Sequence, residues 1–228
     1  MSAKHAVKPL WARAFGVGCP ICQSRAVRFA GSNGRPNAKC PTCGAVERHR
    51  LFWAFLDGRL GPDRRLGNVL HFAPEGFLAP RLRAMSEVYV SVDLDRPETD
   101  VRADITRLPF ATDAFDVVVC SHVLEHVPDD ATAMRELRRV LRPGGWMVAD
   151  VPQVPGQEVT LEDPDADEQT RIEVYLQSDH VRLYGRTDYV RRLTEAGFAV
   201  DQKPGREIVR RGARRQGVLQ DRILFVCS

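Results

Sequence analysis

The stretch Phe115–Pro152, FDVVVCSHVLEHVPDDATAMRELRRVLRPGGWMVADVP, decides the fold of this chain. Residues 115–120 are apolar apart from one aspartate and rich in valine, which is typical of a parallel strand covered on both faces. Apolar residues then recur at helical spacing from Met134 to Leu141, with charged residues on the other face. We expect Pro143-Gly144-Gly145 to end that helix and Trp146–Val151 to form the next strand. The stretch therefore predicts one βαβ unit.

Polar side chains follow the first strand of this unit directly. They are Ser121, His122, Glu125 and His126. Ligands in open α/β sheets bind at the carboxyl ends of the strands. The strand is therefore predicted to lead into a binding site.

The rest of the chain after residue 50 fits a doubly wound α/β domain. Strands are predicted at residues 68–73, 88–94, 101–105, 115–120, 146–151, 198–202 and 222–227. Besides the helix already described, helices are predicted at residues 51–56, 78–85 and 184–196. The stretch 158–173 holds seven carboxylates and one arginine, and it is predicted to be an exposed loop or lid.

Four cysteines near the N-terminus have the spacing of a zinc ribbon. The pattern is C-x2-C-x17-C-x2-C, formed by Cys19, Cys22, Cys40 and Cys43. Four thiolates close a tetrahedral shell and leave no position for substrate, so the predicted Zn²⁺ is structural. Reduced structural cysteines or a redox pair are the alternatives. Cys120 and Cys227 have no such partners and are predicted to be buried core thiols.

Charge is divided unevenly along the chain. Residues 1–50 hold nine Lys and Arg and one acid, whereas the remainder holds 24 basic and 29 acidic residues. A second basic run lies at residues 203–215. A basic ribbon suggests an anionic partner such as nucleic acid, or phosphate on a metabolite. The alternatives are a solvated surface and an electrostatic dock onto the rest of the chain.

The amino-acid sequence of Phe115–Pro152 resembles that of the class I S-adenosylmethionine (SAM)-dependent methyltransferases, in the group that acts mostly on small molecules. In that family a strand like FDVVVCSHVLEHV precedes a helix like RELRRVLRPGG. The resemblance implies a Rossmann-like, doubly wound, seven-stranded methyltransferase sheet that binds SAM. Together with the cysteines, it predicts a zinc ribbon at residues 1–50 and a methyltransferase domain at residues 51–228.

The same resemblance implies which residues bind the cofactor. The family ends its first strand with an acid and a glycine-rich loop. Here the strand runs through His71 into Phe72, Ala73, Pro74, Glu75 and Gly76, so that a single glycine remains. We expect Glu75 to replace the missing acid by pairing with the ammonium group of SAM. A helix-start residue is the alternative reading of Glu75.

Three further strand ends match the family. Asp93, with Leu94 beside it, stands where the family's carboxylate binds the ribose hydroxyls, and Asp95 is the nearby alternative. Asp104 and Ile105 stand where the family contacts the adenine amino group and ring. Ser121 and His122 are expected to line the methyl-donor side.

The sulfonium methyl group is already electrophilic, so the main contribution of the protein to methyl transfer is to position the acceptor in line with the carbon–sulfur bond. An acceptor that keeps its proton needs a base, for which histidine is suited near neutral pH. The candidates are His122, His126 and His180. The alternative roles are a cofactor contact for His122, a helix start for His126 and a capped helix entry at His180. Asp179 is a candidate to orient His180.

The predicted function is SAM-dependent methyl transfer to a small-molecule or metabolite-like acceptor in the cytoplasm. No apolar run approaches the length of a membrane span, and the N-terminus lacks the apolar core of a secretion signal. An RNA methyltransferase that docks its substrate on the ribbon is the first alternative. A methyltransferase-like binding protein without catalysis is the second. The acceptor atom and the oligomeric state are not predicted.

Overall fold

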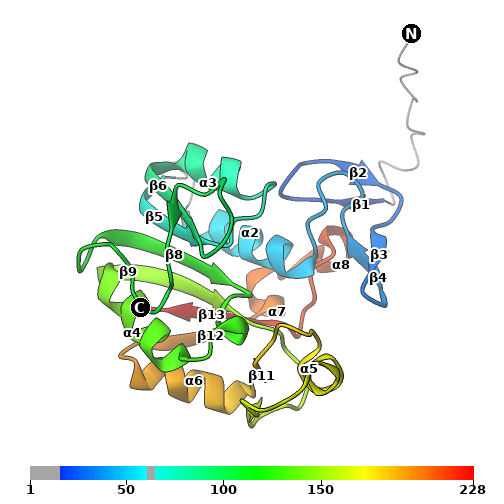
Figure 1. Ribbon diagram of the computed structural model, residues 1–228. Coiled ribbons are helices and arrows are strands. Elements are labelled where there is room, and N and C mark those ends of the chain that lie inside the picture. The colour runs from blue at the N-terminus through cyan, green and yellow to red at the C-terminus, as the bar shows by residue number, and fades with distance from the viewer. Residues whose placement is uncertain (1–15, 61–64) are drawn as a thin grey trace. The chain divides into compact units, whose positions relative to one another are not determined.

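The computed structural model describes residues 16–60 and 65–228 (Figure 1). Their contacts form two compact units. One unit holds the described N-terminal residues through Leu60 together with Pro204–Ile223, and the other holds residues 65–203 and Leu224–Ser228. Three basic residues of the N-terminal count, Lys4, Lys8 and Arg13, lie outside the described residues. The functional domain boundary after residue 50 stays a prediction.

Short hairpins and one long helix make up most of the first unit. Strand β1 (Val17–Gly18) pairs antiparallel with β2 (Arg25–Ala26), and β3 (Ala30–Ser32) pairs antiparallel with β4 (Arg35–Lys39). Helix α2 (Glu47–Leu60) extends beyond the predicted 51–56 at both ends. The later segment adds the short helices α7 (Gly205–Ile208) and α8 (Ala213–Gln216).

A buried arginine in α2 ties this unit together. The Arg50 side chain is fully buried, and its guanidinium donates hydrogen bonds to the carbonyls of Ala45 (2.6 Å), Ala38 (2.8 Å) and Gly217 (2.8 Å). It also lies over the Phe29 ring, 4.1 Å from the centroid. Burial lowers the pKa of Arg50. The one side chain therefore hydrogen-bonds carbonyls of both the ribbon and the later segment.

The second unit is built on a seven-stranded sheet with the order β12-β13-β9-β8-β5-β6-β7 (Figure 1). The strands are β5 (Leu66–Phe72), β6 (Ser86–Asp93), β7 (Val101–Arg102), β8 (Phe115–Ser121), β9 (Leu141–Asp150), β12 (Val200–Pro204) and β13 (Ile223–Cys227). Strands β5 to β9 pair in parallel, and β13 pairs antiparallel with β9. The predicted seven-stranded methyltransferase sheet is confirmed, with β7 shorter than expected.

Helices lie between these strands, as expected for an α/β domain, although the helix that begins in the acid-rich stretch was not predicted. They are α3 (Ala79–Met85), the short 3₁₀ helix η1 (Leu124–His126), α4 (Asp130–Val140), α5 (Glu168–Tyr175) and α6 (Arg186–Glu195). Helix α4 begins where the Asp129 carboxylate accepts the Thr132 N–H at 3.0 Å. Its buried face includes Met134, Leu137 and Val140, which are the residues of the predicted helical spacing.

The strand after α4 begins earlier than predicted. Helix α4 already ends at Val140, and β9 starts at Leu141 and runs through Pro143-Gly144-Gly145. The register with β8 shifts between Phe115 and Val117, so the glycines form an irregularity inside the strand pair. A Cβ at Gly145 would lie 2.8 Å from the backbone oxygen of Asp116, which is why a glycine is needed there.

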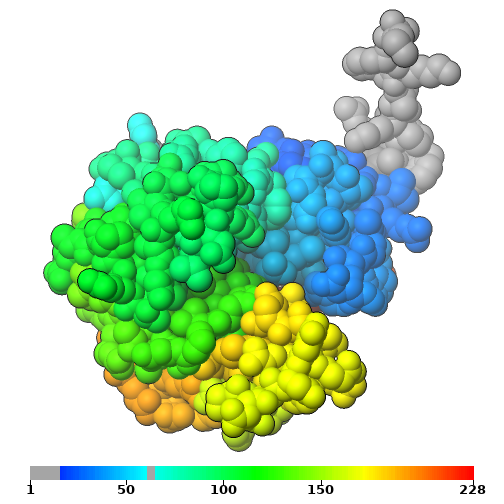
Figure 2. All heavy atoms as spheres, in the orientation of Figure 1, coloured from blue at the N-terminus to red at the C-terminus, as the bar shows by residue number. Residues whose placement is uncertain are grey.

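The acid-rich stretch 158–173 is more ordered than the predicted loop. Strand β10 (Leu161–Glu162) pairs antiparallel with β11 (Arg182–Leu183), and α5 starts at Glu168. Most of its side chains are exposed, and Figure 2 shows this segment, in yellow, on the surface of the second unit. Its carboxylates therefore face water, except where arginines bind them, as described below.

The sheet carries the core of the second unit. Residues of the two central strands such as Leu70, Val118 and Val119 are buried, as expected for strands covered on both faces. Cys120 and Cys227 are both buried thiols, which confirms that prediction. Among the described residues, no helix combines the length and the apolar composition that crossing a bilayer requires.

Candidate functional site

The candidate site lies where the strand order of the sheet reverses. Chain order runs outward in opposite directions from the neighbouring strands β5 and β8, and ligands of doubly wound folds bind at the carboxyl edge of such a point. Strands β5, β6, β8 and β9 are parallel and end at Phe72, Asp93, Ser121 and Asp150. The ends of four predicted strands therefore meet at one edge.

The loop after β5 is preceded by a histidine that is buried in the core. His71 is fully buried, with Nδ1 2.8 Å from the Tyr89 hydroxyl and Nε2 3.3 Å from Glu75 Oε2. The histidine thus occupies a core position between β6 and the loop, and it holds the Glu75 carboxylate. Tyr89 keeps its hydroxyl proton, because burial raises its pKa.

The backbone of this loop leaves room for a ligand. Ala73 has a φ of 45°, in the left-handed region that small residues tolerate best, and its N–H donates to the Val92 carbonyl. Gly76 is exposed, and a Cβ placed there would meet nothing within 4 Å. Phe72 is buried, while Pro74 and Glu75 are half-buried. The residues from Ala73 to Gly76 therefore fit a close approach of a cofactor to the backbone.

The acid at the end of β6 already holds a turn. Asp93 Oδ1 accepts the N–H groups of Asp95 (3.0 Å) and Arg96 (3.2 Å), and Oδ2 lies 3.4 Å from Arg96 Nε. Leu94 beside it is 60% exposed, which is unusual for a leucine and leaves an apolar surface next to the carboxylate. The Arg96 side chain is largely exposed and can turn away into water. Asp93 Oδ2 would then be able to accept a hydrogen bond from a hydroxyl group of a ligand.

Asp104 and Ile105 lie in the loop between β7 and β8. Asp104 is exposed and accepts from the N–H and hydroxyl of Thr106, both at 2.8 Å, whereas Ile105 is buried. The loop is fixed farther along, because Glu136 of α4 accepts the Leu108 N–H at 2.9 Å. A hydrogen bond from Arg139 lowers the pKa of Glu136, so that carboxylate is ionised.

A histidine and two acids gather at the ends of β8 and β9. His122 has a φ of 55°, and its N–H donates to the Asp150 carbonyl at 2.8 Å. Its Nδ1 lies 3.0 Å from Glu125 Oε1, and its Nε2 lies 3.8 Å from Asp150 Oδ2. Sequence reasoning gave no role to Glu125 and did not consider Asp150. The signal for Asp150 was present, since it is the polar residue that ends an apolar strand.

A second group forms next to it from segments far apart in sequence. His126 Nδ1 lies 3.3 Å from Asp179 Oδ2, and the rings of His126 and His180 meet edge to face with centroids 4.7 Å apart. His180 is buried, with Nδ1 2.6 Å from the Tyr175 carbonyl, and burial lowers its pKa. The expected Asp179–His180 pair is therefore wrong, because Asp179 pairs with His126 instead.

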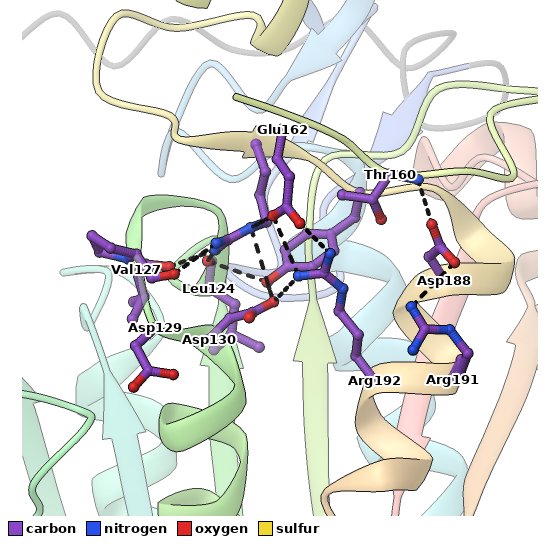
Figure 3. A network of polar contacts seen from close by, with 12 residues as sticks. Leu124, Val127, Asp129, Asp130, Thr160, Glu162, Asp188, Arg191 and Arg192 are labelled. Carbon is purple, nitrogen blue, oxygen red and sulfur yellow. Dashed lines mark hydrogen bonds and ion pairs between the residues drawn. The ribbon is translucent and has the colours of Figure 1, made fainter. Parts of the chain in front are cut away.

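A buried ion network holds the segment that carries these groups (Figure 3). The Arg182 guanidinium donates to the carbonyls of Leu124, Val127 and Pro128 and to Glu162 Oε2 at 2.7 Å. Asp130 Oδ2 accepts from Arg192 Nη1 at 2.9 Å and from the Tyr184 hydroxyl at 2.6 Å. A hydrogen bond from Arg192 also lowers the pKa of Glu162. The network fixes the backbone on both sides of Glu125 and His126.

In the first unit, the four cysteines of the predicted ribbon come together. Their sulfurs lie within 4.8 Å of one another, with Cys19 to Cys43 at 3.8 Å and Cys22 to Cys40 at 3.7 Å. The two knuckles are alike: the Gln23 N–H donates to the Cys19 carbonyl and the Gly44 N–H to the Cys40 carbonyl. Both donors have positive φ values.

The electrostatics of this cluster suit a cation. Burial alone would raise the pKa of Cys40. Hydrogen bonds, chiefly those from the backbone N–H groups of Cys43 and Thr42, outweigh burial and bring this pKa down to about 6. Burial and the neighbouring sulfurs raise the pKa of Cys43. Four thiols in one place cannot all ionise without a compensating charge, which a divalent metal supplies. The donor set and its geometry fit a tetrahedral zinc.

Comparisons with known proteins agree with this arrangement. Residues 75–149 match a family described as "Methyltransferase domain". The uncharacterized protein YafE of Escherichia coli (strain K12) is 35% identical over 94 residues, which is 41% of this chain and 43% of that protein. A demethylmenaquinone methyltransferase of Mycobacterium marinum is 50% identical over 54 residues, 24% of this chain and 23% of that protein. The matched region thus spans less than half the length of these curated relatives.

Solved structures share the fold over a longer part of the chain. An S-adenosylmethionine-dependent methyltransferase from Mesorhizobium loti superposes with a TM-score of 0.53 at 18% identity, over 78% of this chain and 95% of that one. The observed strand order, with β13 antiparallel to β9, is that of a doubly wound sheet of seven strands, as the sequence predicts in outline. Residues 75–149 therefore match a methyltransferase domain family, and the second unit shares its fold with a SAM-dependent methyltransferase of known structure.

Proposed function

We propose that this protein is a SAM-dependent methyltransferase that acts on a small-molecule or metabolite-like acceptor. The observation that carries the proposal is the row of polar residues at the carboxyl edge of β5, β6, β8 and β9, within the region that matches a methyltransferase domain or next to it. Similarity to demethylmenaquinone methyltransferases favours a small acceptor. We assign the activity to the cytoplasm, where thiols stay reduced and available to zinc.

The cofactor assignment follows the strand ends. SAM supplies an electrophilic sulfonium methyl group when it is bound. In our proposal Glu75 binds its ammonium group and Asp93 its ribose, while Leu94 contacts the adenine ring. Asp104 reaches the adenine amino group above the buried Ile105. The exposed Leu94 and the open space at Gly76 support this assignment.

His122 is our candidate for the base. It follows β8 directly and is 21% exposed at its side chain, so it can reach both the site and water. The Glu125 carboxylate, 3.0 Å from Nδ1, stabilises a proton on that nitrogen and leaves Nε2 to accept one from the acceptor. Ser121 beside it lines the methyl-donor side. The rings of His126 and His180 lie edge to face against each other, and we return to them below.

Cofactor binding is the direct test. S-adenosylhomocysteine at about 100 times its Kd should raise the melting temperature of the full-length protein by about 5–10 °C, by mass action. Asp93→Asn should weaken binding at least about tenfold, because a charged acceptor for the ribose is lost. This variant keeps an oxygen for the N–H groups of Asp95 and Arg96, so the melting temperature without ligand should hold. Asp95→Asn is the matched control. No binding by the wild-type protein would favour the binding-protein alternative.

Glu75→Gln tests the altered first loop. If Glu75 pairs with the ammonium of SAM, the neutral amide should weaken SAM binding several-fold in isothermal titration calorimetry. The glutamine oxygen can still face His71, so stability should change little. Glu87→Gln, on an exposed position of β6, controls for the loss of one negative charge. Unaltered SAM affinity together with a lower melting temperature would instead identify Glu75 as a helix-start residue.

One observation keeps an RNA acceptor as the second candidate. The described part of the basic N-terminal stretch and the second basic run, except Lys203, fall in the same compact unit, whose described residues hold thirteen Lys and Arg and four Asp and Glu. Phe29 does not add a stacking platform, because it is buried under Arg50. Binding of an RNA hairpin that weakens steeply with salt would favour this candidate over the small acceptor.

A further inference from the structure

Three side chains beside the proposed methyl-donor site have the chemistry and spacing of a metal site. Glu125, His126 and His180 each offer one ligand atom, and the three atoms lie within 4.8 Å of one another. Two imidazoles and one carboxylate are a donor set that divalent first-row transition ions prefer, and three protein ligands leave positions open. Atoms that bind the same ion lie about 3–3.5 Å from one another. A small movement of the three side chains would therefore bring their ligand atoms to this spacing.

The carboxylate of this group is buried without a hydrogen bond. Glu125 has no exposed surface, and neither of its oxygens accepts a hydrogen bond from any residue that the structure describes. His122 Nδ1 lies 3.0 Å from Oε1, which leaves Oε2 available to a metal ion. A buried carboxylate is costly unless it is paired or binds a metal. The position of Glu125 therefore points to a ligand that the chain itself does not supply.

Both histidines are oriented as metal ligands usually are. His126 Nδ1 faces Asp179 Oδ2 at 3.3 Å, and His180 Nδ1 faces the Tyr175 carbonyl at 2.6 Å. An acceptor at Nδ1 fixes the proton there and leaves the lone pair of Nε2 for an ion. In the structure Gln177 Nε2 lies 2.9 Å from His180 Nε2, and since Gln177 is exposed it can turn away when an ion binds.

The site is also held rigidly. Arg182 binds the carbonyls of Leu124, Val127 and Pro128, and the Val181 N–H donates to the Glu125 carbonyl at 2.9 Å. The segment that carries His180 is thereby joined to the η1 helix that carries the other two ligands. Rigid support of this kind is what a metal site needs from its surroundings.

We propose that Glu125, His126 and His180 bind one divalent first-row transition ion, and that its open positions bind oxygen atoms of the methyl acceptor. The second part rests on the proposed methyltransferase function and names its substrate class as a hydroxyl compound, best with two adjacent hydroxyls. A bound ion would lower the pKa of a hydroxyl that it holds. The proton would pass to His122, the oxygen lone pair would form the bond to the methyl carbon, and the carbon–sulfur electron pair would stay on the sulfur of the thioether product.

Mn²⁺ is the probe, because it binds oxygen and nitrogen ligands but competes poorly for four thiolates. The full-length protein, purified with zinc, is titrated with Mn²⁺ while the electron paramagnetic resonance signal of free Mn²⁺ is followed. We expect one bound Mn²⁺ per chain. His126→Gln and Glu125→Gln should each weaken it at least about tenfold, and Asp179→Asn about tenfold through the lost orientation of His126.

Controls separate the possible failures. Asp165→Asn, on the exposed acid-rich stretch, should leave Mn²⁺ affinity unchanged. His126 is partly exposed, so its variant carries the test if the buried Glu125→Gln does not fold. Absence of Mn²⁺ binding, or equal binding by wild type and His126→Gln, overturns the metal site even when S-adenosylhomocysteine binds. Mn²⁺ binding without S-adenosylhomocysteine binding overturns the methyltransferase function but not the metal site.

The acceptor class has its own readout. Catechol serves as the probe with two adjacent hydroxyls, and calorimetry should detect its binding only when Mn²⁺ is present. The His126→Gln variant should lose this Mn²⁺-dependent binding. Catechol binding that is unaffected by Mn²⁺, or absent with Mn²⁺ bound, overturns the hydroxyl acceptor.

Discussion

Cys40→Ser should abolish zinc binding and unfold the first unit. Structural zinc contributes apparent free energies of about 10–16 kcal/mol in small zinc domains, more than the whole stability of many folds. Native mass spectrometry of the wild-type protein should find one zinc per chain, and the variant should carry none. Hydrogen exchange should accelerate in the two hairpins β1–β2 and β3–β4, because Cys19 and Cys22 lie in the turn of the first hairpin and Cys40 and Cys43 directly follow the second.

The hydrogen bonds of the buried Arg50 indicate which other segment should lose structure when the ribbon unfolds. Its guanidinium binds carbonyls of both the ribbon and the segment around Gly217, so loss of the ribbon should also expose that segment to exchange. Cys227→Ala is the matched control, since it removes a buried thiol of β13 and should leave the zinc in place. A wild-type protein that is folded but free of metal would show that the cysteines are reduced structural residues instead.

Arg182→Met should produce the second largest effect. It leaves three backbone carbonyls without their donor and removes the cation that lies 2.7 Å from Glu162 and 3.9 Å from the buried Asp130. Removing one partner of a buried ion pair costs about 3–5 kcal/mol, which lowers the melting temperature of a domain of this size by about 10 °C. Exchange of the Val181 N–H, which reports on the contact with η1, should accelerate as well.

Arg191→Met is the control for this prediction. Arg191 also binds two carboxylates, Glu195 at 2.8 Å and Asp188 at 3.4 Å, but it lies on the exposed face of α6. Surface ion pairs contribute little, so its melting temperature should stay close to that of the wild type. Similar losses in both variants would mean that the Arg182 network does not act as a buried support.

The sequence predicted the parts of this protein that depend on local periodicity and fixed spacing. The valine-rich strand at residues 115–120 and the helix around Met134 follow from which residues must be buried, because burial repeats with the period of the element. The cysteine pairs predicted their own cluster, since each knuckle is a local turn. Element ends were less certain. The strand through Pro143-Gly144-Gly145 begins early because pairing with β8 outweighs the local tendency to turn.

Residues far apart in sequence met in ways that local patterns do not encode. The Tyr89 hydroxyl lies 2.8 Å from His71 Nδ1, and the other ring nitrogen of His71 lies 3.3 Å from the Glu75 carboxylate. Asp179 pairs with His126, 53 residues away, and not with its neighbour His180. The Arg182 network links η1, α4, β10 and α6, although its members look like ordinary surface charges in the sequence.

By itself, then, the sequence determined the strands of the sheet and the four-cysteine cluster, because hydrophobic period and ligand spacing are local properties. The strand ends that we propose for cofactor binding were implied by the resemblance to methyltransferases. Only the tertiary structure decided which polar side chains share the site. The group of Glu125, His126 and His180 exists because β11 and η1 are held together by one buried arginine, and a contact of that kind is set by packing between distant segments.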